Sequence, residues 1–334
     1  MTERAEEMRF YSVEYFETIK KIVLQYAWEN YDYCYLEAMH SKNQMDECID
    51  TIVVGSSHSM NGIVEERLLC GSNVINYSVS SQDIYYDFLH IKKAVENSKG
   101  DIKRCIINLG YYMLYQDLSK SANFKQLIQQ VYYPLFGDAH HYVGEPQYDF
   151  MSKLSGAKQY YNREVLAKLC EEWARGFFIE ESSYYGSLKT REKNNILGLQ
   201  NIEWALVDKK AKVEYAINRT NGHNGLKKYT ESFLENVHII EKMTSYLYEH
   251  NIIPIFVIMP FTNYYNMYIN PEYKFEIYQV LDSLKVPVEF LDMNDYSEIF
   301  EDADFLDSDH LNYRGAIKAT ELLNDFLLEI EGGK

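Results

Sequence analysis

Short apolar runs rich in β-branched residues alternate with helical patterns over two stretches of the chain. In the first stretch, residues 51–54, 73–76 and 104–109 have strand length, while residues 59–69 and 82–97 predict helices. In the second, apolar runs at 252–259 and 286–291 alternate with helical patterns at 230–250, 271–284 and 313–329. Strands that alternate with helices predict βαβ units and a parallel sheet, so we expect a doubly wound α/β domain.

The alternation stops between the third and fourth predicted strands. Residues from about 117 to 229 carry mostly helical patterns with aromatic interruptions and no convincing long strand. Near the N-terminus, apolar residues spaced by three and four predict a helix over residues 8–40. We therefore expect an N-terminal helical segment over 1–45 and one α/β domain over 46–334, with a large insertion at about 117–229.

Composition narrows the class of protein. Apolar residues make up 46% of the chain and charged residues 25%, which is enough apolar material for a sizeable core. We expect no transmembrane helix, because no run of 18 apolar residues occurs, and no secretory signal, because the charged start lacks an apolar segment. The chain has five cysteines: Cys34, Cys48, Cys70, Cys105 and Cys170. Their odd number and the lack of Cys-x-x-Cys spacing argue against disulfides and cysteine zinc sites and favour a location in the cytoplasm.

Charge and aromatic content bear on partners. The net charge of −17 disfavours binding to nucleic acid or to an anionic membrane surface. The 31 tyrosines fit either sugar stacking in a polar cleft or ordinary amphipathic packing. Oligomer formation is compatible with this composition.

A serine-rich turn, Gly55-Ser56-Ser57, follows the first predicted strand. In open α/β sheets, sites form outside the carboxyl ends of strands, and the N–H groups at a helix start can stabilise an oxyanion. Ser57 is therefore a candidate nucleophile. The alternative is that Ser56, Ser57 and Ser59 only cap the following helix.

Asp307 and His310 stand three residues apart near the other end of the chain. One turn can bring this carboxylate against the imidazole, so that His310 acts as a general base whose tautomer Asp307 sets. Asp304 and Asp309 are alternative acids. A metal site of Asp307, Asp309 and His310 would lack a second ligand cluster, so we expect neither a metal nor another cofactor.

Two further segments end predicted strands. Residues 76–83 could offer backbone N–H donors beside the first turn, or cap a helix through Ser80 or Ser81. In residues 108–112, Gly110 permits a tight turn and Tyr112 can donate a hydroxyl hydrogen bond. The alternative is a strand end anchored by aromatic side chains.

These four segments, in order and each at a strand end, resemble the SGNH (GDSL-like) hydrolase superfamily. By resemblance, Ser57 is the nucleophile, His310 the base and Asp307 the acid, while Ser78 and Tyr112 stand where the family places its oxyanion glycine and asparagine. The resemblance covers about 45–116 and 230–330. The serine turn and the Asp-Ser-Asp-His-Leu-Asn segment look most like the divergent branch found with bacterial polysaccharide and teichoic-acid modification, including DltD-like and alginate acetylation proteins.

The resemblance implies a three-layer, flavodoxin-like sandwich and a serine esterase or O-acyltransferase that acts on an acylated carbohydrate or small molecule. Its oxyanion donors would be the backbone N–H groups of Ser57 and Ser78, with help from Tyr112. Three polar residues in the same segments are further candidates for substrate contact: His58, Asn108 and Asn312.

The departures at Ser78 and Tyr112 keep other hypotheses open, because the loss of one oxyanion donor can cost about 10²–10³ in rate. The second hypothesis is a catalytically weak or inactive relative that binds a glycan or assembles a polysaccharide-modifying complex. The third is an unrelated α/β binding protein in which the motifs occur by chance.

Overall fold

The computed structural model describes residues 30–69, 73–143 and 203–332. The described residues divide into two compact units. One contains residues 30–42 and 125–143, and the larger one contains the described residues of 43–124 and 203–332. All the residues predicted to carry chemistry lie in the larger unit.

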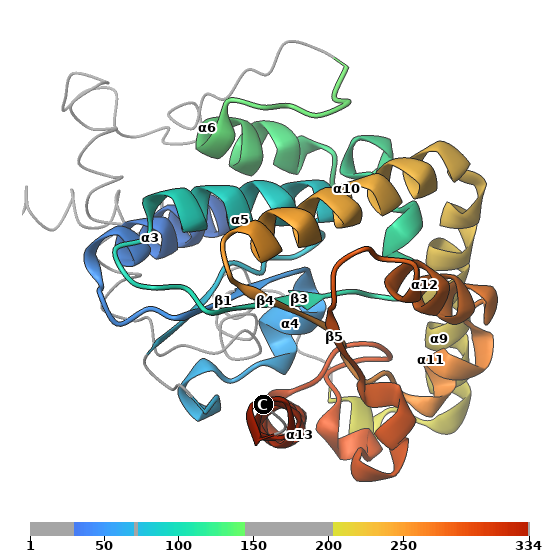
Figure 1. Ribbon diagram of the computed structural model, residues 1–334. Helices are drawn as coiled ribbons and strands as arrows, with labels where there is room; N and C mark the ends of the chain where they lie inside the picture. Colours follow the sequence, from blue (N-terminus) through green and yellow to red (C-terminus); the bar gives the residue numbers. More distant parts are fainter. Residues whose placement is uncertain (1–29, 70–72, 144–202, 333–334) are drawn as a thin grey trace, which may run out of the picture. The chain divides into compact units, whose positions relative to one another are not determined.

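A five-stranded sheet, in which every strand is parallel to its neighbours, forms the centre of the larger unit (Figure 1). The strands lie in the order β2-β1-β3-β4-β5: β1 (Thr51–Val54), β2 (Val74–Asn76), β3 (Arg104–Asn108), β4 (Ile253–Ile258) and β5 (Glu289–Asp292). The predicted parallel sheet is therefore confirmed, although β5 begins three residues later than position 286. Most strand residues are buried, as expected where helices cover both faces of a parallel sheet.

The strand order creates a switch point between β1 and β3. The chain leaves β1 for the outer strand β2 and then crosses back to β3, on the other side of β1. In sheets of this order, ligands bind at the carboxyl ends of the two strands where the direction of winding reverses. Val54 pairs with Ile107, so the turns after β1 and β3 leave the sheet at nearly the same level.

Helices flank both faces of the sheet in the larger unit (Figure 1). α5 (Ile84–Asn97) and α10 (Thr230–Glu249) pack on each other over one face, while α4 (Ser57–Gly62) and α13 (Tyr313–Gly332) pack on each other over the opposite face. This arrangement gives three layers. On the α13 side, apolar residues of the strands and of α13 share one core: Val53, Ile106, Ile255, Val257, Leu291, Ala319, Leu323 and Leu327.

The remaining helices differ in part from the sequence prediction. α4 is shorter than predicted, because Gly62 ends it and is followed by the 3-10 turn Glu65–Arg67. α12 (Glu272–Asp282) matches its prediction, whereas α11 (Asn263–Tyr268) was not predicted and begins where the Thr262 hydroxyl accepts a hydrogen bond from Tyr265 N–H. Further 3-10 helices span Met113–Tyr115, Leu118–Lys120, Met293–Ile299 and Asp302–Asp304.

The described part of the predicted insertion, residues 117–143 and 203–229, contains helical elements and no strand. In the larger unit these include a 3-10 helix (Trp204–Leu206), α9 (Lys209–Asn224) and a 3-10 helix (Gly225–Lys228). In the smaller unit they are a π-helix (Ile128–Tyr132) and α6 (Tyr133–Phe136), which ends at Gly137 in the left-handed conformation. The predicted domain boundaries stay a prediction.

Only the end of the predicted N-terminal helix can be compared with the structure. α3 spans Tyr31–Met45, and the rest of the predicted helix falls in residues 1–29, outside the described residues. The described cysteines, Cys34, Cys48 and Cys105, form no disulfide, while Cys70 and Cys170 also lie outside the described part. None of the described helices is long and apolar enough to cross a membrane.

Candidate active site

Gly55 makes the turn that presents Ser57 at the end of β1. Its φ is +148°, a backbone conformation that side chains disfavour. A Cβ atom here would lie 2.6 Å from Ser59 Oγ and 2.7 Å from Asn108 Cβ. Glycine therefore lets the chain pass close to β3 and enter α4 at once, which places the partly buried Ser57 as the first residue of that helix.

Ser57, His310 and Asp307 form a continuous hydrogen-bonded chain. Ser57 Oγ lies 2.8 Å from His310 Nε2, and His310 Nδ1 lies 2.9 Å and 3.0 Å from the two Asp307 carboxylate oxygens. Because a carboxylate only accepts hydrogen bonds, His310 Nδ1 carries the ring proton. Nε2 is then free to accept the Ser57 hydroxyl proton, which is the tautomer that a general base requires.

A tight loop holds Asp307 against His310. Phe305 and Leu311 form an antiparallel bridge, and Leu306 N–H donates to the His310 carbonyl at 2.8 Å. Inside this loop, Asp307 Oδ1 accepts hydrogen bonds from the backbone N–H groups of Asp309 and His310 at 3.0 Å and 2.9 Å. The three-residue spacing thus orients the carboxylate before it contacts the imidazole.

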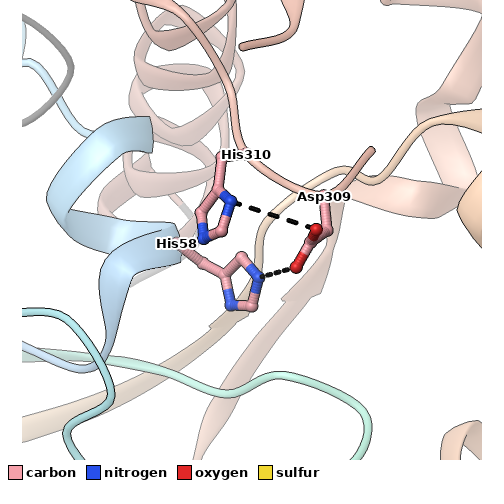
Figure 2. Close-up of side chains that lie close together, drawn as sticks. All are labelled: His58, Asp309 and His310. Carbon is pink, nitrogen blue, oxygen red and sulfur yellow. Dashed lines mark hydrogen bonds and ion pairs between the residues drawn. The ribbon is translucent and has the colours of Figure 1, made fainter. Parts of the chain in front are cut away.

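The two alternative acids have other partners. Asp304 is buried and pairs with Lys318 at 2.7 Å and Arg314 at 2.9 Å. Asp309 Oδ1 lies 3.9 Å from His310 Nδ1, which is an ion-pair distance but too long for a hydrogen bond (Figure 2). Asp307 is therefore the carboxylate that bonds the imidazole directly.

Asp309 belongs to a second buried chain beside the first. Its side chain is 0% exposed, and Arg219 Nε of α9 donates to its two carboxylate oxygens at 3.0 Å and 2.9 Å. His58 Nε2 lies 3.3 Å from Asp309 Oδ2, and the His58 ring stacks on the His310 ring with centroids 4.9 Å apart (Figure 2). Sequence reasoning missed Arg219, because it lies in the insertion and forms no motif with distant residues.

Aromatic side chains pack against the buried side of the site. Tyr112 stacks on His223 of α9 with ring centroids 3.7 Å apart, and His223 Nδ1 lies 2.6 Å from the Tyr265 hydroxyl. The His58 ring makes edge contacts with Tyr112 and Phe261. Burial raises the pKa of Tyr112 and lowers the pKa of His223, so both side chains are neutral near pH 7.

The charged side chains shift one another's pKa values. Burial alone would lower the pKa of His310, but the charges of Asp307 and Asp309 raise it above the usual value for histidine. Burial would raise the pKa of Asp309, yet His310, Arg219 and His58 hold it well below its usual range. Burial lowers the pKa of His58, which outweighs the opposite effect of its hydrogen bond to Asp309. His58 is therefore neutral beside an ionised Asp309.

The predicted oxyanion donors differ in how they are placed. Ser57 opens α4, so its backbone N–H belongs to the first turn of a helix, where such groups lack a helical partner. The Ser78 N–H donates to Asn76 Oδ1 at 2.9 Å, and Ser78 Oγ accepts from Ser59 Oγ at 2.7 Å. An oxyanion role for Ser78 or for the buried Tyr112 stays a prediction, and for Ser78 it would require the N–H to be shared with Asn76.

The three candidates for substrate contact bond protein atoms in this structure. His58 is 1% exposed, with Nδ1 facing Ser56 Oγ and Nε2 facing Asp309. Asn108 is fully buried and donates to the Val257 carbonyl, while Asn312 caps α13 by accepting from Gly315 N–H. Substrate contact by these residues stays a prediction that their present contacts do not support.

His58, Asp309 and His310 also form a group whose potential metal-ligand atoms lie within 4.8 Å of one another. Their contacts fit an ion-paired network better than a metal site. Arg219 contacts both Asp309 oxygens, and His310 Nδ1 faces Asp307. A divalent cation would have to compete with a guanidinium for the same carboxylate.

Comparison with known proteins adds no assignment. No family model matches the chain, and no curated protein matches it at a significant level.

Proposed function

We propose that this protein is an SGNH-type serine hydrolase or O-acyltransferase that acts on ester-linked acyl groups. Ser57 is the nucleophile, His310 the general base and Asp307 the acid that orients the imidazole. The observation that carries the proposal is the chain in which Ser57 Oγ lies 2.8 Å from His310 Nε2 and His310 Nδ1 lies 2.9 Å from Asp307 Oδ2. Distances of this size suit proton transfer from a nucleophile to its base.

The first half-reaction forms an acyl-enzyme. Ser57 Oγ attacks the acyl carbonyl carbon while its proton passes to His310 Nε2, and the carbonyl oxygen becomes an oxyanion. As the ester C–O bond breaks, the leaving alkoxide takes the proton from His310 Nε2, and the acyl group stays on Ser57. Asp307 keeps its hydrogen bond to His310 Nδ1 and stabilises the imidazolium while it exists.

The second half-reaction releases the acyl group. His310 takes a proton from water or from an acceptor hydroxyl, whose oxygen attacks the acyl carbon. The bond to Ser57 breaks and Ser57 Oγ recovers its proton from His310. Attack by water gives a carboxylic acid, whereas attack by a sugar hydroxyl gives a new ester, so access to the acyl-enzyme decides between hydrolysis and transfer.

The position of the site in the fold supports an SGNH assignment. The sheet order β2-β1-β3-β4-β5 is the flavodoxin-like order, and Ser57 and Tyr112 follow the two strands of its switch point. The motifs at the strand ends resemble those of polysaccharide O-acylation proteins. We therefore propose an acylated carbohydrate as the substrate class. The odd number of cysteines without Cys-x-x-Cys spacing supports the cytoplasm as the proposed location.

A catalytically weak relative is the second candidate. It is favoured by the hydrogen bond from Ser78 N–H to Asn76 and by the stacked, buried Tyr112 in place of the family's asparagine. A protein that only bound glycans would not need Ser57 in contact with His310. The 2.8 Å distance between them therefore favours a catalytic protein.

The test is acyl release from p-nitrophenyl acetate. We expect Ser57→Ala to lower kcat/KM by about 10³ or more, because it removes the hydroxyl that forms the acyl-enzyme. Ser283→Ala, an exposed serine beyond the end of α12, removes the same hydroxyl away from the site and should leave the rate unchanged. Equal rates for the wild-type protein and Ser57→Ala would contradict the proposal.

A further inference from the structure

We propose that Asp309, which is ion-paired with Arg219 and hydrogen-bonded to His58, is a second carboxylate that positions His310 and stabilises its protonated form without a hydrogen bond to it. This inference rests on the proposed role of His310 as general base. It gives a function to a buried charge that the Ser57–His310–Asp307 chain does not use.

The first step in the argument is the cost of burying Asp309. A buried carboxylate is costly unless it is paired and hydrogen-bonded. Here the side chain is 0% exposed and receives hydrogen bonds from Arg219 Nε, at 2.9 Å and 3.0 Å, and from Ser308 Oγ at 3.1 Å. Two other elements, α9 through Arg219 and α4 through His58, thus converge on a carboxylate of the Asp307–His310 loop.

The second step is the contact between His58 and His310. Because Asp309 can only accept, His58 Nε2 carries the ring proton, and Nδ1 can accept the Ser56 hydroxyl proton across 3.3 Å. These contacts fix the plane of the His58 ring. His310 stacks on it at 4.9 Å between centroids and 21° between planes, so His58 forms one wall against which the His310 ring is held (Figure 2).

The third step is the charge balance around His310. Among the described residues, the titratable side chains other than Asp307, Asp309 and Arg219 that act on this cluster are neutral near pH 7. Burial lowers the pKa of the histidines and raises the pKa of the tyrosines in this set: His58, Tyr112, Tyr215, His223 and Tyr265. Two carboxylates and one guanidinium then give the cluster a charge of −1 at rest. Proton transfer to His310 brings that charge to zero.

The charge of Asp309 determines the net charge of the cluster when His310 is protonated. Without its charge, Asp307 and Arg219 would cancel, and protonation of His310 would leave a net positive charge in a largely buried site. Asp309 Oδ1 lies 3.9 Å from His310 Nδ1, and opposite charges within about 4–6 Å shift a pKa by roughly 1–3 pH units. The carboxylate therefore favours the imidazolium that forms as Ser57 attacks.

The experiment is an NMR titration of the His310 ring, with Asp309→Asn as the test variant. We expect the His310 titration midpoint to fall by about 1 pH unit or more in this variant. Asp282→Asn at the exposed end of α12 removes an equal charge and should leave the midpoint unchanged. A midpoint in Asp309→Asn that equals or exceeds the wild-type value would overturn the proposal.

A second variant covers the case in which Asp309→Asn does not fold. Arg219→Met/Asp309→Asn removes both charges and leaves neither unpaired. We expect a smaller fall in the His310 midpoint, because Asp309 acts on His310 more strongly than Arg219 does. An unchanged or higher midpoint in this double variant would also contradict the proposal.

Turnover of p-nitrophenyl acetate separates the two proposals. If Ser57→Ala abolishes turnover while the charge variants leave the His310 midpoint unchanged, the proposed function stands and the role of Asp309 fails. If the midpoint shifts as expected but the wild-type protein shows no Ser57-dependent turnover, the proposed function fails instead.

Discussion

Replacement of Arg219 by methionine should destabilise the protein through Asp309. Arg219 is the permanent cation that pairs with this fully buried carboxylate among the described residues. Removal of one partner of a buried ion pair costs about 3–5 kcal/mol. Because 35% of the Arg219 side chain is exposed and both Ser308 and His58 still face Asp309, we expect a loss at the lower end, about 3 kcal/mol of unfolding free energy.

The loss should depend on pH. In the wild-type protein the pKa of Asp309 lies well below its usual range, so its stabilising effect is present at neutral pH and is lost as pH falls through that low pKa. In Arg219→Met the carboxylate keeps its burial without its cation, so its pKa rises. Protonation then relieves the unpaired charge, and the difference in stability from wild type should be smaller at pH 5 than at pH 8.

Thermal unfolding followed by circular dichroism measures this effect. At about 2–4 °C per kcal/mol for a domain of 150–250 residues, the melting temperature should fall by about 6–12 °C at pH 8. The matched control is Arg314→Met, because the buried Asp304 that it leaves still pairs with Lys318 at 2.7 Å. Equal losses for the two variants, or a loss for Arg219→Met that does not depend on pH, would refute the reasoning.

Three other predictions follow from the same geometry. Turnover should rise with pH through a midpoint above the ordinary histidine value of about 6.5, because the pKa of His310 is raised. Only the neutral form of His310 accepts the Ser57 proton. A pH–rate profile with its midpoint below 6.5 would contradict this prediction. Asp307→Asn should lower kcat by roughly 10³–10⁴, since the amide can favour the wrong tautomer of His310, and a loss below tenfold in steady-state assays would count against the role of Asp307. Gly55→Ala should lower the melting temperature and the turnover rate together, because the new Cβ would lie 2.6 Å from Ser59 Oγ and 2.7 Å from Asn108 Cβ. An unchanged melting temperature would show that the turn tolerates a side chain.

Periodicity and turn chemistry were enough to predict the main features of the fold. The strands at 51–54 and 253–258 are short, apolar and bounded by turns, so their length and their alternation with helices identify them as parallel strands. The contact between Asp307 and His310 was also predictable, because they stand three positions apart in one loop. The start of β5 was misplaced, since residues 286–288 continue an apolar pattern without pairing with β4.

Other parts of the site could not be predicted from local sequence. Arg219 and Asp309 are 90 positions apart and meet only because α9 packs beside the Asp307–His310 loop. The hydrogen bond from the Ser78 N–H to Asn76 Oδ1 depends on the backbone path after β2, which the residue types alone do not determine. The buried position of His58 was missed because its neighbours Ser57 and Ser59 indicate only a helix start, not which face of that helix is covered.

The central claim is that Ser57 is a nucleophile activated by His310, and site-resolved mass spectrometry after treatment with a fluorophosphonate tests it most directly. We predict a single adduct on Ser57 in the folded wild-type protein, with neither Ser56 nor Ser59 modified and with labelling strongly slowed in His310→Ala. An adduct on another serine, or labelling that persists in Ser57→Ala, would contradict the account.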